Sequence, residues 1–181
     1  GWYSPNDKRA LSGTPYKISE LLESLGCDIS WIKISQSFKY RLYEKLSRKF
    51  NKILGRKPLD CSHSVIGAKL QSKTIDMQKV HECDILVAPF CSEALYSLKT
   101  EKPIIYLTDA TFGIMVDYYF KGLSNYAINQ GNQVEQKAMD TATEIIVSSQ
   151  WTANSAINDY HQEPSKVHVI EFGANIDDKD I

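Results

Sequence analysis

No run of eighteen apolar residues occurs in this 181-residue chain, so the sequence predicts no transmembrane helix. The opening stretch Gly1-Trp-Tyr-Ser-Pro-Asn-Asp lacks the apolar segment of a secretory signal peptide. No internal repeat or low-complexity tract is present. We therefore expect a cytoplasmic protein, or a chain whose start has been trimmed.

Cysteine is scarce, and its spacing does not match the usual metal patterns. The chain has four cysteines, none of them in a C-x-x-C pair and none with a histidine at metal-ligand spacing. They are Cys27, Cys61, Cys83 and Cys91. This pattern predicts free thiols in or near the core, a reducing compartment and no metal site.

Motifs for nucleotide cofactors and nucleophilic catalysis are absent too. Neither the G-x-G-x-x-G fingerprint nor a P-loop occurs, so the sequence supports neither NAD binding nor ATP hydrolysis. Of the four histidines, His63 is the one in a plausible loop, and no Ser/His/Asp or Cys/His arrangement can be placed. We therefore expect no cofactor in this domain.

The overall composition is that of an ordinary globular domain, with 43% hydrophobic and 24% charged residues. The net charge of -1 conceals an asymmetry. Residues 36–58 carry eight Lys or Arg against the single acid Glu44, whereas the remainder has thirteen basic and twenty-one acidic residues. One basic segment is thus set against an acidic body.

Short apolar runs alternate with helical patterns along the chain, which predicts βαβ units. We expect strands at 28–34, 84–89, 103–107, 145–147 and 167–170. We expect helices from Thr14 to Gly26 and at 36–54, 69–81, 92–99, 111–120 and 125–141, with another after Trp151, whereas residues 61–68 are ambiguous. The run 84–89 has the composition of a strand buried on both faces.

Buried parallel strands flanked by helices predict an α/β, Rossmann-like, doubly wound fold with a mostly parallel sheet and helices on both faces. The first strand of such a fold should precede the Ser12-Gly13 turn. Residues Gly1 to Ser4 leave little room for it, so we expect this strand to be truncated or only partly present.

Ligands of open parallel sheets bind beyond the carboxyl ends of the strands, and most of those loops are polar here. Gly13 and Thr14 are the best candidates for a phosphate contact, because a glycine at a helix start lets an anion approach free backbone N–H groups. The alternative is a plain turn with Thr14 as the helix cap. A polar ligand such as a sugar fits these loops better than an apolar one.

Three further strand-end residues have both a functional and a structural interpretation. Asp109 follows an apolar strand and is the candidate catalytic residue, or else the cap of the helix at 111–120. Glu93 either contacts a ligand or complements a helix dipole, and Ser149 either lines the pocket or caps the helix at Trp151.

The basic segment forms an amphipathic helix, with Phe38, Leu42, Leu46, Phe50 and Ile53 on one face. One interpretation is a core-packed helix with a solvated cationic face. The other is that the helix from Lys39 to Arg56 binds an anionic membrane surface, which would make the protein peripheral to the membrane. Nucleic-acid binding is not expected, because the rest of the chain is acidic and has no recognised motif.

The C-terminal residues carry a family resemblance. The run Glu135–Ser149, together with Tyr160, Pro164, Lys166–Ile170 and Gly173–Asp177, resembles the end of the N-terminal domain of family-4 retaining glycosyltransferases of the GT-B architecture. Ser12-Gly13-Thr14 likewise resembles the glycine loop after the first strand of that family. The resemblance is loose over most of the chain and good from Glu135 onward.

This resemblance implies one half of a two-domain enzyme that moves a sugar from a nucleotide-sugar donor to a hydroxyl acceptor. Residues 1–173 would form the acceptor-binding domain and residues 174–181 would begin the linker. The donor-binding C-terminal domain would lie outside this chain, so the isolated fragment should be inactive. Gly13 and Thr14 would approach the donor diphosphate.

By the same resemblance, residues Asp109 to Phe112, including Thr111, would line the cleft near the transferred sugar. Glu93 and Ser149, chosen for their strand-end positions, complete the expected acceptor pocket. The chain departs from the family twice. Gly13 stands alone where many members have a Gly-Gly pair, and Thr108-Asp109-Ala110-Thr111 replaces a common histidine. The alternatives are a stand-alone α/β module that binds or regulates through a small ligand, and half of a sugar-nucleotide epimerase.

Overall fold

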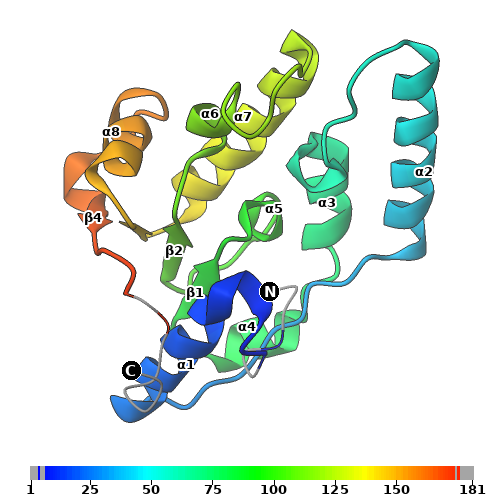
Figure 1. The fold of residues 1–181 in the computed structure, drawn as a ribbon. Helices are drawn as coiled ribbons and strands as arrows, with labels where there is room; N and C mark the ends of the chain where they lie inside the picture. Colours follow the sequence, from blue (N-terminus) through cyan, green and yellow to red (C-terminus); the bar gives the residue numbers. More distant parts are fainter. Residues whose placement is uncertain (1–3, 5–6, 174, 176–181) are drawn as a thin grey trace.

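Four short apolar runs form an all-parallel sheet in the order β1-β2-β3-β4. They are β1 (Leu86–Pro89), β2 (Ile104–Thr108), β3 (Glu144–Val147) and β4 (Val167–Val169). In the register across the sheet, Ala88 lies beside Tyr106, Tyr106 beside Ile145, and Ile145 beside Val167. The computed structural model, which describes residues 4, 7–173 and 175, thus confirms the last four predicted strands (Figure 1).

Helices connect each strand to the next and cover one face of the sheet (Figure 1). They are α5 (Ser92–Leu95), α7 (Asn125–Thr141) and α8 (Gln150–Asn158), with the short α6 (Phe112–Met115) between β2 and α7. Such crossovers are right-handed, so a sequential strand order places them on the same face. The core lies between this face and Ala138, Met139 and Ala156 of the helices.

The N-terminal half supplies helices beside and beyond the β1 edge. They are η1 (Ala10–Gly13), α1 (Thr14–Ser24), α2 (Phe38–Ile53), η2 (Cys61–His63), α3 (Val65–Ser72) and α4 (Met77–Glu82), and η3 (Pro164–Lys166) precedes β4. Ser37 and Ser64 cap α2 and α3 by accepting bonds from the amides of Tyr40 and Gly67. The result is the predicted Rossmann-like α/β fold, a parallel sheet flanked by helices.

Four predicted elements differ in the structure. The helix expected at 92–99 is reduced to α5. Residues 28–34 are in no strand, because the larger hollow of the molecule, about 860 Å³, lies between them and the outer edge of β1. The predicted helix at 69–81 is broken by a turn between Ser72 and Met77, and the one at 111–120 is reduced to α6. A ladder needs a neighbouring strand, which sequence periodicity cannot guarantee.

The outer side of β1 is also more open than its composition suggests. Val87 keeps 37% of its surface exposed, so the prediction that this strand is buried on both faces is wrong. Leu86 and Phe90 donate their amides to Pro103 and Leu107 of the β2 side, which makes β1 the edge strand of the described sheet.

Gly131 lies within α7 and does not interrupt it. The ring of Phe112 packs where a side chain would be, since a Cβ at position 131 would lie 2.1 Å from Phe112 Cζ. The glycine is therefore required by helix packing.

The four cysteines are free thiols, as predicted, but they are not all in the core. Cys61 and Cys91 are buried and Cys83 is half-buried, whereas Cys27 is exposed. No helix of the described part of the chain is long and apolar enough to cross a membrane. The predicted first strand falls largely, and the linker at 174–181 almost wholly, outside the described residues.

Helix α2 faces in an unexpected direction. Its inward side is polar and aromatic, with Tyr40 2% exposed, whereas Phe38 and Ile53 on its apolar side are 81% and 72% exposed. The interpretation of α2 as a helix with its apolar face in the core is therefore wrong.

Candidate functional site

Polar and aromatic side chains gather where the first three strands end. β1 runs into Phe90, β2 into Asp109, and β3 into Ser148 and Ser149. The carboxyl ends of parallel strands share one edge of a sheet, so these residues belong to one region of the surface. The candidate site is built on this edge.

Phe90 has a strained backbone directly after β1. Its φ is +52°, a left-handed value that bulky side chains rarely adopt, and its amide still donates to Leu107 O at 2.9 Å. The ring meets Phe172 edge to face, with centroids 5.9 Å apart. Strain of this kind persists only where the surroundings hold it, and it is concentrated at functional sites.

The start of α1 is brought to the same edge by the segment after β4. Asn175 Nδ2 donates to Ser12 O at 3.0 Å and to Thr14 Oγ1 at 2.8 Å. The neighbouring Phe172 touches Phe90, and both Leu11 and Phe90 line the larger hollow. The N-terminal loop thus lies beside the carboxyl end of β1.

Gly13, and not Thr14 as predicted, is the N-cap of α1. Its φ is +82°, and a Cβ there would lie 3.2 Å from Lys8 O, so the position favours glycine. Because glycine has no side chain, no side chain caps α1, and Pro15 follows in its first turn. The amide of Thr14 already donates to Leu11 O and Pro15 has no N–H, so an anion at this helix start would meet the helix dipole and the amides further into the first turn.

Asp109 lies exposed just beyond β2. Its carbonyl oxygen accepts bonds from Thr152 Oγ1 at 2.6 Å and Ser148 Oγ at 3.3 Å, which fixes the loop against the end of β3. The cap of α6 is Thr111, whose Oγ1 accepts from the amide of Ile114. Asp109 is therefore not a helix cap, and its carboxylate faces solvent at the candidate site.

Thr111 is wholly buried beneath this loop. Its hydroxyl lies 2.8 Å from Ser155 Oγ, which in turn donates to Asp159 Oδ2 at 2.7 Å. The hydroxyl of Thr111, which the resemblance assigns to the sugar pocket, is therefore already used in hydrogen bonds within the protein. Thr111 fixes the loop that carries Asp109.

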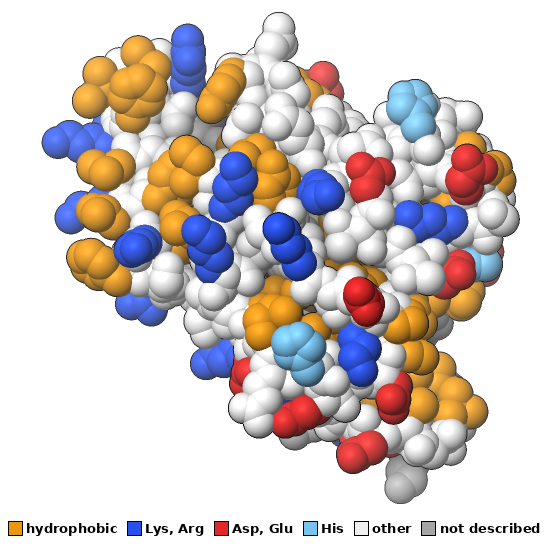
Figure 2. Space-filling model, turned by 180° about the vertical axis from the view of Figure 1, so that it is seen from behind, with side chains coloured by type: hydrophobic (Ala, Val, Ile, Leu, Met, Phe, Trp, Pro, Cys, Tyr) orange, Lys and Arg blue, Asp and Glu red, His pale blue; other side chains and the backbone are white. Residues whose placement is uncertain are grey.

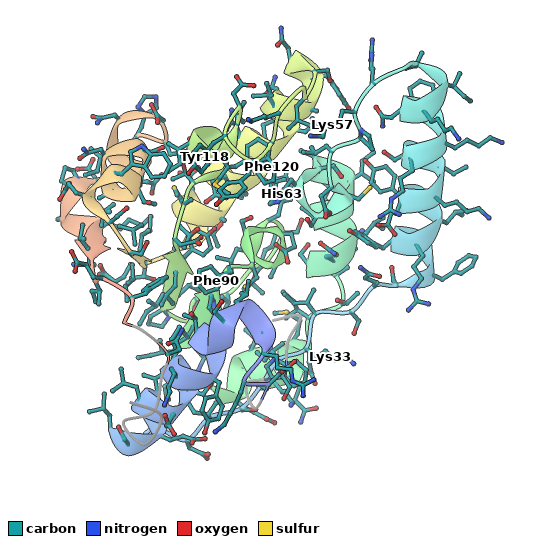
Figure 3. The ribbon with its side chains drawn as sticks, viewed as in Figure 1. Lys33, Lys57, His63, Phe90, Tyr118 and Phe120 are labelled. Atoms are coloured by element: carbon teal, nitrogen blue, oxygen red, sulfur yellow. The ribbon has the colours of Figure 1, made fainter. Side chains whose placement is uncertain are left out.

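Phe112 is also buried, in an aromatic cluster with His63 and Phe120. Its ring stacks on Phe120 at 5.2 Å and lies tilted against His63 at 5.2 Å. Figure 3 shows His63, at the end of η2, beside Phe120, which follows α6. Burial lowers the pKa of His63, so its imidazole is neutral at pH 7.

Exposed aromatic side chains continue beyond this cluster. Tyr118 packs edge to face on Tyr119. Its ring centroid lies 6.5 Å from that of Trp151, in the first turn of the helix after β3. Lys57, on the loop after α2, donates to Lys121 O at 2.7 Å and so ties the two loops together (Figure 3). The edge therefore combines the exposed carboxylate of Asp109 with the exposed aromatic rings of Tyr118, Tyr119 and Trp151.

The other two predicted pocket residues have structural positions. Ser149 caps α8 by accepting a bond from the amide of Thr152 at 3.2 Å, which confirms its interpretation as a helix cap. Glu93 is 4% exposed in the first turn of α5, whose N-cap is Cys91. Burial, reinforced by the charge of Glu93, raises the pKa of Cys91 to about 12.

Sequence analysis missed Glu135, which is buried on α7 against Tyr106 of β2. It accepts a bond from Tyr106 Oη at 3.0 Å. Burial, reinforced by the charge of Glu93, raises the pKa of Glu135 to about 7. The available signal was a carboxylate between Val134 and Ala138 on the apolar side of a predicted helix.

No three His, Cys, Asp or Glu side chains converge to hold a metal ion within the described residues. Neither the models of known protein families nor the curated proteins give a match to this chain. The site must therefore be interpreted from its own geometry.

Proposed function

We propose that this chain is the acceptor-side domain of a retaining glycosyltransferase, which transfers a sugar from a nucleotide-sugar donor to a hydroxyl acceptor. The observation that carries the proposal is the uncapped start of α1, at Gly13, beside the strained end of β1. An anionic diphosphate suits that position, because backbone N–H groups and the helix dipole both favour negative charge there.

The remainder of the edge suits a sugar or another polyhydroxy group. The exposed carboxylate of Asp109 can accept hydrogen bonds from hydroxyl groups, and the exposed Tyr118 and Trp151 offer apolar rings nearby. The role of such a domain is to hold the acceptor in line with the donor, while stabilisation of the departing diphosphate falls mainly to the donor half.

Nucleotide release from a panel of nucleotide sugars, with and without hydroxyl acceptors, tests this function on the full-length protein. We expect Asp109→Asn to lower turnover about tenfold or more, the loss expected for one hydrogen bond to a charged group. Asp117→Asn is the matched control, since Asp117 is exposed in the next loop and its φ of +63° suits asparagine. The control should turn over at the unaltered rate.

Asn175→Asp tests the anion position separately. The added carboxylate beside Thr14 should repel a diphosphate and raise the KM for the nucleotide sugar, whereas Asn175→Ala should have a smaller effect. If no nucleotide sugar releases its nucleotide although a small ligand binds, the proposal is wrong and the binding-module alternative stands. Epimerised donor in place of transfer product would assign the chain to the epimerase alternative.

A further inference from the structure

Helix α2 presents an apolar stripe to solvent. The stripe consists of Phe38, Leu42, Leu46, Phe50 and Ile53, and each of these side chains is between 47% and 81% exposed. These positions recur at spacings of three and four, so they share one side of the helix. A continuous exposed apolar surface of this kind marks an interaction site.

The opposite side of α2 holds the helix to the protein through polar and aromatic groups. Tyr40 is buried, and Tyr43 Oη donates to Ser64 Oγ at 3.1 Å. Ser47 and Asn51, on the same side, are half-buried and bonded to each other. The helix is therefore anchored by this side, and its apolar stripe is left available for something else.

Cationic side chains accompany the stripe. Residues 36–58 carry a charge of about +7 from eight Lys or Arg and one Glu at neutral pH. Lys45 and Lys49 lie three residues after Leu42 and Leu46, so they are neighbours of the stripe on the helix surface. Figure 2 shows hydrophobic and basic side chains intermixed along the edge of the molecule formed by α2.

A groove of about 550 Å³ adjoins the stripe. Leu46, Phe50 and Ile53 form one wall, with Arg56 at the end of the helix, and Ile66 and Tyr126 belong to the opposite wall. The apolar surface of α2 thus continues into a hollow with a cationic rim.

An anionic lipid surface matches each of these features. Phe, Leu and Ile side chains enter the boundary between headgroups and acyl chains, while lysines on long stems reach the phosphates. A second copy of the chain matches poorly, because pairing through α2 would bring two segments of like charge together. Nucleic acid matches the charge but leaves the aliphatic side chains Leu42, Leu46 and Ile53 without a partner.

We propose that the apolar stripe of α2 and its flanking lysines bind the protein to an anionic membrane surface, with α2 lying in the plane of the interface. The helix does not span the bilayer in this arrangement. The acidic remainder of the chain favours the orientation in which α2 faces the lipid.

Co-sedimentation of the purified protein with vesicles tests this proposal. We expect binding to phosphatidylcholine vesicles that contain phosphatidylglycerol, little binding to pure phosphatidylcholine, and weakening as salt is raised. Lys45→Gln/Lys49→Gln should lower the partition coefficient about thirtyfold, at roughly fivefold per lysine. Phe38→Ser/Phe50→Ser should lower it at least about tenfold, through lost apolar burial.

Matched control variants remove the same groups elsewhere. Lys73→Gln/Lys137→Gln removes two exposed lysines, and Leu21→Ser/Leu25→Ser removes two exposed apolar side chains, one in α1 and one at its C-cap. Both should bind vesicles like the unaltered protein. Because all the changed residues are exposed, the variants should keep the unaltered Tm, which thermal unfolding checks.

The proposal is overturned if the protein does not bind anionic vesicles, or if the control variants and the α2 variants lose vesicle binding equally. It is also overturned if light scattering shows a dimer that Phe38→Ser/Phe50→Ser dissociates while vesicle binding is absent. In that case the stripe is an interface between two copies of the chain.

Discussion

Helices α2 and α7 are nearly equal in length, at 16 and 17 residues, and both are amphipathic, yet they face the protein in opposite ways. α7 buries Ala138 and Met139 in the core that contains the strands, whereas α2 buries Tyr40 and exposes Phe38 and Ile53. The difference shows that an apolar stripe identifies a surface in need of a partner without saying which partner that is. For α7 the partner is the sheet, and for α2 we infer a membrane.

The neighbours of each helix explain the difference. α7 connects β2 to β3 and packs against α5, so its position in the crossover brings its apolar side onto the sheet. α2 packs mainly against α3, which offers it the hydroxyl of Ser64. A helix outside the layer that covers the sheet can therefore turn its polar side inward.

Truncation of a core side chain on α7 should have the largest effect on stability. Met139 is fully buried, so Met139→Ala should lower the free energy of unfolding by about 2–5 kcal/mol. Urea denaturation measures the change. Met77→Ala on α4 is the matched control. Because Met77 is 37% exposed, its truncation should lower the free energy of unfolding much less. Equal losses in the two variants would mean that α7 is not the core helix described above.

The buried carboxyl of α7 should make stability depend on pH. The pKa of Glu135 is raised from 4.5 to about 7 by burial, so the folded state holds its proton more tightly than the unfolded state. The stabilisation is fully present below about pH 4.5 and is lost as pH rises through about 7, amounting to roughly 3 kcal/mol.

Glu135→Gln removes this dependence while keeping an oxygen to accept the bond of Tyr106. The stability of the unaltered protein should therefore fall relative to that of the variant between pH 4.5 and pH 7. Urea denaturation at pH values across this range gives the comparison. Parallel pH profiles for the two proteins would contradict the raised pKa.

Gly131→Ala should destabilise α7 by about 1–3 kcal/mol, because the added methyl group overlaps the ring of Phe112. Intrinsic helix propensity alone predicts the opposite, a gain of up to about 1 kcal/mol. Phe112→Leu in the same chain should relieve part of the loss, and a double-mutant cycle measures the coupling. A variant more stable than the unaltered protein would mean that Phe112 moves aside without cost.

The sequence predicts the sheet well because its signal is local. The four strands from β1 to β4 are short apolar runs between turn residues, and each was found within two residues of its expected position. Residues 28–34 have a similar composition but lack an adjacent strand, and composition does not report what lies alongside a segment.

The candidate site was predictable in outline and not in detail. Strand-end loops were located from the sequence: Asp109 directly follows β2, and Leu11, near Gly13, lines the same hollow as Phe90 at the end of β1. The sequence could not show that Thr111 and Phe112 are buried supports, because that depends on Ser155 and His63, which are 44 and 49 residues away along the chain. Glu135 was missed because periodicity marks a buried position without giving its partner.

The smallest effect should come from Leu46→Ala on α2. Leu46 is 57% exposed, so the free energy of unfolding should change by less than about 0.5 kcal/mol. Leu46 is also aliphatic and, like Met139, sits on a long amphipathic helix, so the pair compares truncation on the two helices directly. A loss of about 2 kcal/mol or more would place Leu46 in a core, because only a buried side chain leaves such a cavity. The apolar stripe of α2 would then already have its partner within the protein, and the reason to expect a membrane there would disappear.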